Sequence, residues 1–228
     1  MKGAVVLLSG GMDSSTLLHY VKGRLAVASV HALSFDYGQK HSRELEAAAW
    51  QAENAGVERH EVIDVSFIKE LVARGSALTD ERVEVPRLAC LGSEQRRQPP
   101  TYVPNRNMIL LSLAAAYAES HGLCDLFYGA QAQDEYGYWD CTRKFLDGIN
   151  KVLSLNRRQP VTVHAPFIGM RKAEVLKLGL ELGVDFGRTW SCYRGGARPC
   201  DACPTCVERA KAFRELAVGD PLAAADAV

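Results

Sequence analysis

The fold of this 228-residue chain is decided by one stretch near its start, Val5-Val6-Leu7-Leu8-Ser9-Gly10-Gly11-Met12-Asp13-Ser14-Ser15. Its four branched apolar residues predict a short buried strand, the glycines and the Ser/Asp/Ser group predict a tight turn, and residues 16–21 predict a helix. The first N–H groups of a helix lack partners within it, and the helix dipole makes that end positive. Glycine lets a phosphate approach the backbone, and serine hydroxyls donate hydrogen bonds. The stretch therefore predicts an anion site at a helix N-terminus.

The glycine turn differs from two common nucleotide loops, because no Lys follows it as in G-x-x-x-x-G-K-[ST] and it lacks G-x-G-x-x-G. It resembles the S-G-G-x-D-S loop of the ATP pyrophosphatases, or PP-loop proteins. That resemblance implies ATP as a substrate and a loop that holds the departing pyrophosphate while an acceptor is adenylated, with Mg²⁺ held at Asp13. The implied ATP-binding residues are Leu8, Ser9, Gly10, Gly11, Met12, Asp13, Ser14 and Ser15. An ordinary strand–helix turn capped by Asp13 is the structural alternative.

Apolar strands alternate with helical stretches along the rest of the chain. Further strands are predicted at about residues 25–35, 60–65, 123–130 and 161–166, and helices at about 42–55, 66–73, 108–122, 140–156 and 171–182. This order predicts an α/β, Rossmann-like parallel sheet of about five strands with helices on both faces and ligands outside the strands' carboxyl ends. Residues 74–100 lack periodicity and predict a mobile insertion bordering the site. We expect a nucleotide-binding domain at 1–188 and a metal-binding segment at 189–228.

Composition excludes several classes of protein. The chain has 27 Lys and Arg against 27 Asp and Glu, so its net charge is zero, which argues against nucleic-acid binding. No apolar run reaches the roughly 18 residues of a membrane span. The predicted strand at the very start leaves no room for a signal peptide, so we expect a cytoplasmic protein.

Four of the seven cysteines form the pattern C-x7-C-x2-C-x2-C, at Cys192, Cys200, Cys203 and Cys206. Two x2 spacings fold thiolates around one ion, and the preceding cysteine completes a tetrahedral set. We expect structural Zn²⁺ here, because four thiolates leave no open position for a substrate. An iron–sulfur cluster is the alternative occupant.

Five motifs occur in a characteristic order: SGGMDSS, FDYGQKHSRELEAA, YVPNRN, DEYGYWDCTRKF and WSCY…PCDACPTC. Together they resemble the 7-cyano-7-deazaguanine synthase family over nearly the whole chain. The resemblance implies ATP-dependent conversion of 7-carboxy-7-deazaguanine and ammonia into the nitrile, on the route to queuosine or archaeosine. It also implies a zinc ion in the tail and a homodimer.

Candidate site residues follow from these motifs. Arg106 and Lys172 come after turn-like segments at the expected edge of the sheet, so with Asp13 they are the candidate catalytic residues; a solvated surface charge is the alternative for each cation. The loop near residue 138 combines carboxylates with aromatic rings, which suit a planar base. The candidate substrate-binding residues are Gln39, His41, Asn105, Asp134, Tyr138 and Asp140.

Four positions depart from the family's usual pattern. Asn105 stands where the family has glycine, and Trp139 and Thr142 stand where it has proline and arginine. Ala132 stands where an acidic residue is typical, two positions before Asp134. These changes leave open a related PP-loop ligase that joins the deazaguanine carboxylate to another amine. A PP-loop tRNA-thiolating enzyme is a further alternative. A zinc-ribbon module that binds nucleic acid is the alternative from a different class, although it would leave the N-terminal loop without a role.

Overall fold

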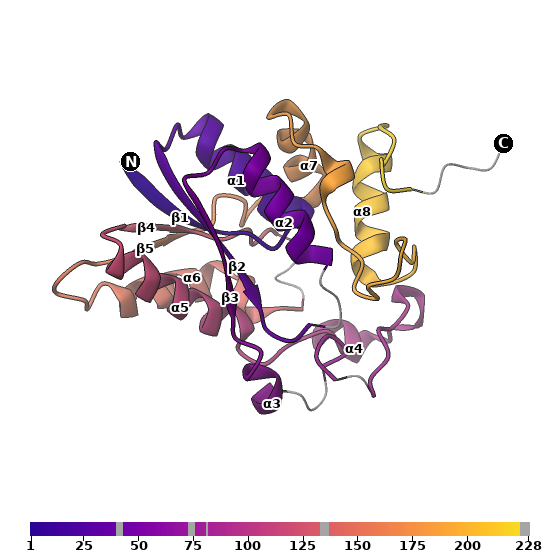
Figure 1. The fold of residues 1–228 in the computed structure, drawn as a ribbon. Helices are drawn as coiled ribbons and strands as arrows, with labels where there is room; N and C mark the ends of the chain where they lie inside the picture. Colours follow the sequence, from indigo (N-terminus) through magenta and orange to yellow (C-terminus); the bar gives the residue numbers. More distant parts are fainter. Residues whose placement is uncertain (40–42, 73–75, 81, 133–136, 224–228) are drawn as a thin grey trace.

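The computed structural model describes residues 1–39, 43–72, 76–80, 82–132 and 137–223, and over these it is built on one parallel sheet (Figure 1). The strands lie in the order β3-β2-β1-β4-β5, and every neighbouring pair is parallel. Their bounds are β1 Gly3–Leu7, β2 Ser29–Asp36, β3 Arg59–Asp64, β4 Asp125–Phe127 and β5 Thr162–His164. The predicted Rossmann-like sheet of about five parallel strands is confirmed.

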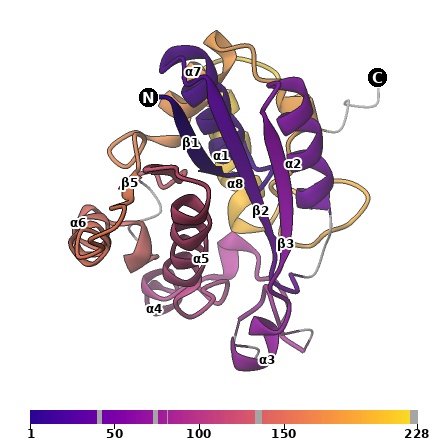
Figure 2. The ribbon, with the colours of Figure 1, turned by 60° about the vertical axis from the view of Figure 1, so that its left-hand side comes forward.

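Helices cover both faces of this sheet (Figures 1 and 2). One face packs against α1 Met12–His19, α2 Arg43–Asn54 and α7 Lys172–Glu181, and the other against α5 Arg106–Ser120 and α6 Arg143–Leu153. Successive side chains of a strand point to opposite faces, so Val5 packs with α5 and α6 while Val6 packs with α1 and α2. Because both faces are buried, the strands are nearly continuous apolar runs.

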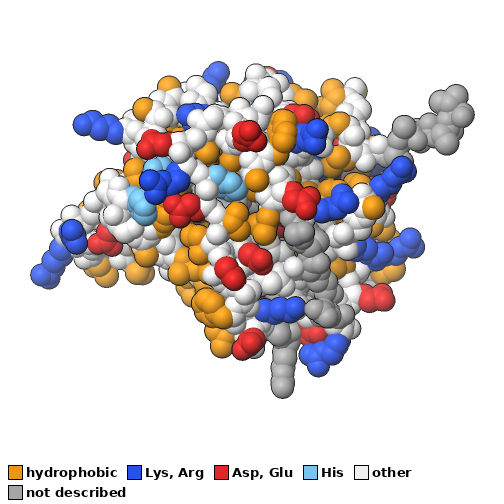
Figure 3. Space-filling view, in the orientation of Figure 1, with side chains coloured by type: hydrophobic (Ala, Val, Ile, Leu, Met, Phe, Trp, Pro, Cys, Tyr) orange, Lys and Arg blue, Asp and Glu red, His pale blue; other side chains and the backbone are white. Residues whose placement is uncertain are grey.

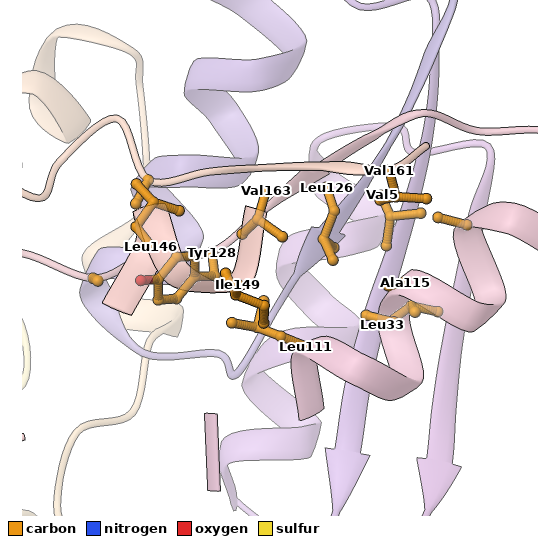
Figure 4. Packing of buried hydrophobic residues seen from close by; sticks show 14 of the residues in the cluster. Val5, Leu33, Leu111, Ala115, Leu126, Tyr128, Leu146, Ile149, Val161 and Val163 are labelled. Carbon is orange, nitrogen blue, oxygen red and sulfur yellow. The ribbon is translucent and has the colours of Figure 1, made fainter. Parts of the chain in front are cut away.

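Helix α5 forms the centre of one core layer. Its buried residues are Leu111, Ala114, Ala115 and Ala118. Figure 4 shows Leu111 and Ala115 in one cluster with Leu33 of β2 and Ile149 of α6. The alanines let the helix approach the sheet closely, and its first residue, Arg106, lines the cavity described below.

Helix α1 begins at Met12, four residues before the predicted start, and Gly11 is its N-cap residue. The Asp-Ser-Ser group therefore forms the first turn of the helix instead of a turn that precedes it. Met12 is buried against α7 and α8, which explains why the helix extends back to this position. The helix continues into one π turn, Tyr20–Arg24.

Residues 76–98 contain short elements that are too brief to show periodicity, the 3-10 turn η2 at Leu88–Cys90 and helix α4 at Ser93–Arg97. This region contacts the cysteine segment, since Leu88 N–H donates to the carbonyl of Ala202 at 2.9 Å. The unpredicted helix α8, Pro204–Glu215, follows the last cysteines and packs beside α7. The remaining elements are α3 Ile68–Val72, η4 Trp139–Cys141 and η5 Phe186–Arg188.

Candidate active site

The predicted phosphate-binding loop, residues 9–15 and called the phosphate loop below, is closed by contacts between Ser9 and Ser14. Ser14 Oγ accepts a hydrogen bond from Ser9 N–H at 3.1 Å and lies 3.0 Å from Ser9 Oγ. Gly11 N–H donates to Ser9 Oγ at 3.3 Å, and the Ser14 hydroxyl donates to the Gly11 carbonyl at 3.2 Å. No side chain caps α1 at Gly11, so the predicted alternative of a cap by Asp13 is not what the structure has. The first N–H groups of α1 are left for a ligand.

Gly10 lets this loop lie directly against α2. Its φ is +78°, and a Cβ at this position would lie 2.2 Å from the Glu44 carbonyl and 2.6 Å from the Ala48 nitrogen. On the other side, the Gly10 carbonyl accepts a hydrogen bond from Trp190 N–H at 2.9 Å. The loop is therefore held between α2 and the cysteine segment.

A cavity of about 630 Å³ opens beside this loop. Its lining includes residues from the phosphate loop, from the segment after β2, from the first turns of α2, α5 and α7, and from α8. Of the predicted site residues, it brings together Leu8, Ser9, Gly11, Met12, Asp13, Ser14, Gln39, Arg106, Tyr138 and Lys172. Gly10 and Ser15 lie behind its surface, and Ser15 is fully buried.

Two lysines line the part of the cavity beside the phosphate loop, Lys172 of α7 and Lys211 of α8. Lys172 Nζ lies 2.9 Å from Asp13 Oδ2, and only 10% of the Lys172 side chain is exposed. Glu208 and Lys211 of α8 also line the cavity, three residues apart on one helix face. Burial raises the pKa of Glu208, opposed by the charge of Lys172. Sequence reasoning missed these two α8 residues because it did not predict the helix.

Tyrosines and an arginine line another part. Arg106 Nη1 donates to the Tyr37 hydroxyl at 3.4 Å, and the guanidinium lies 5.8 Å from the centre of that ring. The hydroxyls of Tyr138 and Thr101 lie 2.7 Å apart. Burial raises the pKa values of Tyr37 and of Tyr193, a further lining residue, so both hydroxyls are neutral. Flat rings with neutral donors and one cation suit a planar, polar-edged ligand.

Glu44 lines the cavity from the first turn of α2. Sequence reasoning used this residue only as part of a helix start. Burial raises the pKa of its carboxyl to about 7, and the charge of Arg106 opposes this shift. A carboxyl that titrates near neutral pH inside a ligand cavity is the kind of group that transfers protons.

Two predicted substrate-binding residues lie outside the cavity lining. Asn105 is the N-cap residue of α5 with φ +55°, in the left-handed region where asparagine is one of the better tolerated non-glycine residues. Asp140 is 2% exposed, and its Oδ2 accepts a hydrogen bond from Asn107 N–H at 3.1 Å. Burial raises the pKa of Asp140, opposed by Arg106. Both residues contact the N-terminal end of α5 and neither lines the cavity. Their direct contact with a substrate therefore stays a prediction.

The other predicted substrate-binding residues fall into two groups. Gln39 lines the cavity, and its Oε1 accepts a hydrogen bond from Tyr37 N–H at 2.9 Å. His41 and Asp134 lie outside the described residues.

The remaining family departures make local structural contacts. Ala132 N–H donates to the Met170 carbonyl at 3.0 Å, and this residue does not line the cavity. Trp139 Nε1 donates to the Tyr102 hydroxyl at 2.7 Å, and 46% of Trp139 is exposed. Thr142 is the N-cap residue of α6, where its side chain accepts a hydrogen bond from Phe145 N–H at 3.2 Å. Neither residue lines the cavity.

The four predicted metal ligands converge on one point. The Sγ atoms of Cys192, Cys200, Cys203 and Cys206 all lie within 4.8 Å of one another. A tetrahedron with metal–sulfur bonds of roughly 2.3 Å has sulfur–sulfur edges of roughly 3.8 Å, so a slight contraction suffices. Hydrogen bonds from Cys192 and Cys206 hold the pKa of Cys203 below its ordinary value. The group fits a metal ion that binds thiolates.

Comparison with known proteins now assigns the family. The family model described as "Queuosine biosynthesis protein QueC" matches residues 3–217. The chain belongs to the QueC family. A 7-cyano-7-deazaguanine synthase from Archaeoglobus fulgidus is 50% identical over 220 residues, covering 96% of this chain and 89% of that protein. One from Caldicellulosiruptor saccharolyticus is 46% identical over 219 residues, covering 96% and 94%. The family resemblance inferred from the motifs is confirmed.

Among solved structures, the chain is similar to the U34-tRNA thiolase NcsA from Methanococcus maripaludis with its [4Fe-4S] cluster. The TM-score is 0.51 at 15% identity, and the match covers 93% of this chain and 63% of that chain. At this identity the likeness supports the fold alone.

Proposed function

We propose that this QueC-family protein is an ATP-dependent 7-cyano-7-deazaguanine synthase that converts 7-carboxy-7-deazaguanine and ammonia into the nitrile, within queuosine-type biosynthesis. The observation that carries the proposal is one cavity that joins the Ser9–Ser14 loop to an aromatic region with a cation, Arg106. Relatives 40–50% identical over nearly the whole chain carry the synthase name.

The chemistry requires activation of oxygen twice. A carboxylate does not react with ammonia until one oxygen can leave. Attack of that oxygen on the α-phosphate of ATP releases pyrophosphate, and ammonia then displaces AMP to give the amide. A second AMP transfer to the amide oxygen allows that oxygen to leave and the nitrile to form. Catalysis of both transfers rests on stabilising charge on phosphate oxygens.

The phosphate region supplies this charge stabilisation. The first N–H groups of α1 and the Ser9 hydroxyl bind the departing pyrophosphate, and Lys172 adds a positive charge. Asp13 holds Lys172 in place at 2.9 Å and offers carboxylate oxygen to Mg²⁺. Lys211 extends the cationic lining from α8. Arg106 and the tyrosines bind the planar acceptor.

The acceptor amine is ammonia on this proposal. The family departures all lie outside the cavity lining: Asn105, Ala132, Trp139 and Thr142. They therefore give no reason to expect a larger amine in place of ammonia.

The cysteine group holds structural Zn²⁺ on this proposal. Cys192, Cys200, Cys203 and Cys206 would hold the ion, and this would fix the start of α8 and help to keep Glu208 and Lys211 on the cavity surface. All four ligands are thiolates, so the metal takes no direct part in the chemistry.

Partners and location follow from the same class of enzyme. We expect a homodimer in the cytoplasm that acts on small molecules. No helix within the described ranges is long and apolar enough to cross a membrane. On the face seen in Figure 3, Lys and Arg are interspersed with Asp and Glu instead of gathered into one basic area. This pattern and the zero net charge do not favour a nucleic-acid-binding module.

The deciding experiment is a product assay. Purified protein is incubated with 7-carboxy-7-deazaguanine, ATP, Mg²⁺ and ammonium, and the products are identified by mass spectrometry. We expect the nitrile, with AMP and pyrophosphate released. Turnover of ATP without any nitrile would refute the proposal, and replacement of ammonium by other amines would then identify the acceptor.

A further inference from the structure

The proposed reaction removes every proton from the incoming nitrogen. Ammonium carries four N–H bonds, and the nitrile product carries none. When ammonia attacks the adenylated carboxylate, nitrogen bonds to carbon, the C–O bond to AMP breaks, and AMP leaves with that electron pair. A proton must then leave the nitrogen, so a base must lie beside the reacting carbon. This requirement rests on the proposed function.

Three carboxylates line the cavity within the described residues: Asp13, Glu44 and Glu208. Asp13 is paired with Lys172 at 2.9 Å. Glu208 has Lys172, Asp13 and Lys211 as its charged neighbours, so it lies with Asp13 on the phosphate-loop side of the cavity. Glu44 is the lining carboxylate whose charged neighbour is Arg106, on the side of the tyrosines.

The position of Glu44 suits this role. Its backbone carbonyl packs against Gly10 of the phosphate loop, while its side chain is influenced by Arg106 of α5. Tyr37 after β2 and Tyr193 of the cysteine segment face it as well. Glu44 therefore lies between the phosphate loop and the tyrosine–arginine region, where the α-phosphate of ATP and the acceptor carboxylate must meet.

We infer that Glu44 is the general base that takes protons from the attacking nitrogen. Its carboxylate accepts one proton as ammonia displaces AMP, and it passes that proton to solvent before the next transfer. Burial without a lysine partner raises the pKa of this carboxyl to about 7, which suits a base that works near neutral pH. The positive charge of Arg106 opposes this rise in pKa, so the carboxyl can still lose its proton near neutral pH.

The test compares Glu44→Gln, Glu44→Asp and the control Glu46→Gln. Glu46 is an exposed carboxylate in the same helix turn. Two reactions are measured: nitrile formation, and ATP–pyrophosphate exchange without ammonium, which reports the first adenylation alone. We expect Glu44→Gln to lower kcat for nitrile formation about 100- to 1,000-fold and to leave exchange within about threefold. Glu44→Asp should recover part of the rate, and Glu46→Gln should resemble the wild type.

The pH profile gives a second readout. When kcat/KM is expressed per free ammonia, so that deprotonation of ammonium itself does not contribute, the wild-type value should rise as pH passes through about 7, and in Glu44→Gln this limb should disappear. Equal loss of exchange and of nitrile formation, or an unchanged profile, would overturn the inference. A different result would refute the proposed function itself: a wild type that performs ATP–pyrophosphate exchange but forms no nitrile.

Discussion

At the scale of single residues, the pair between Asp13 and Lys172 joins the phosphate loop to α7. The Asp13→Ala variant should lower the ATP-dependent rate at least about 100-fold, because Lys172 loses the carboxylate that positions it. Loss of this mostly buried partner should lower the free energy of unfolding by about 1–3 kcal/mol. Nitrile formation, urea unfolding and bound-metal content check this together, and the metal content should not change.

Asp147→Ala is the matched control, since Asp147 is an exposed carboxylate on α6, away from the cavity lining. Comparable activity of Asp13→Ala and Asp147→Ala would contradict the assignment of the loop.

Glu44 gives a pH prediction for stability. Its pKa is raised from 4.5 to about 7 in the folded chain, so the unfolded chain gives up the proton at lower pH than the folded chain does. The stability contributed by the protonated carboxyl is complete below about 4.5 and is lost as pH rises through about 7. Relative to Glu44→Gln, the free energy of unfolding of the wild type should fall by about 1–3 kcal/mol as the pH rises through this range. Denaturant unfolding of both proteins from pH 5 to 8 measures the difference, and parallel curves would sink the prediction.

At the scale of elements, the contact between the phosphate loop and α2 depends on a missing side chain. Gly10→Ala places a Cβ 2.2 Å from the Glu44 carbonyl, on a residue whose backbone is left-handed. We therefore expect the free energy of unfolding to fall by more than about 2 kcal/mol and ATP turnover to be lost. Gly148→Ala is the opposite case, because a Cβ at this exposed position in α6 would meet no atom within 4 Å beyond its chain neighbours and its own helix backbone. The free energy of unfolding of Gly148→Ala should rise by up to about 1 kcal/mol, because alanine favours a helix more than glycine does. Thermal unfolding of the two variants tests both signs.

The elements differ in how far their sequence predicts them. Strands such as β1 are predictable because burial on both faces requires an unbroken apolar run. The start of α1 is not, because Ser and Asp favour turns locally while packing of Met12 against α7 and α8 extends the helix. Helix α8 has a buried face of Cys206, Arg209, Ala212 and Phe213, and arginine is a residue type that rarely indicates a core.

At the scale of the whole molecule, the cysteine group links α8 to the domain that holds the phosphate loop. Removal of the metal with a chelator, or Cys203→Ser, should lower the unfolding temperature by at least about 10 °C and weaken ATP binding. The Cys124→Ser control, at an exposed free thiol, should leave both unchanged. Metal analysis of the purified protein identifies the ion, and iron in place of zinc would refute the zinc assignment.

The candidate site was predictable where its residues stand inside motifs and unpredictable where only the tertiary fold joins them. Ser9, Asp13 and Lys172 line the cavity as expected. Lys211 reaches it from a segment far along the chain that no motif covers, and Tyr193 stands in the WSCY motif, where the neighbouring cysteine indicates a metal site and not a ligand cavity. Asp140 belongs to a recognisable motif, yet it is buried against the first turn of α5, where its carboxylate accepts a hydrogen bond from the N–H of Asn107.

The hydrogen bond from Trp190 N–H to Gly10 joins two residues that leave the ribosome at very different times. The phosphate loop is synthesised long before Glu208 and Lys211. A nascent chain that ends before Cys203 has the strands, but it lacks the α8 side of the cavity. The cavity is therefore complete only after α8 has been synthesised, so chains that end before α8 should not consume ATP.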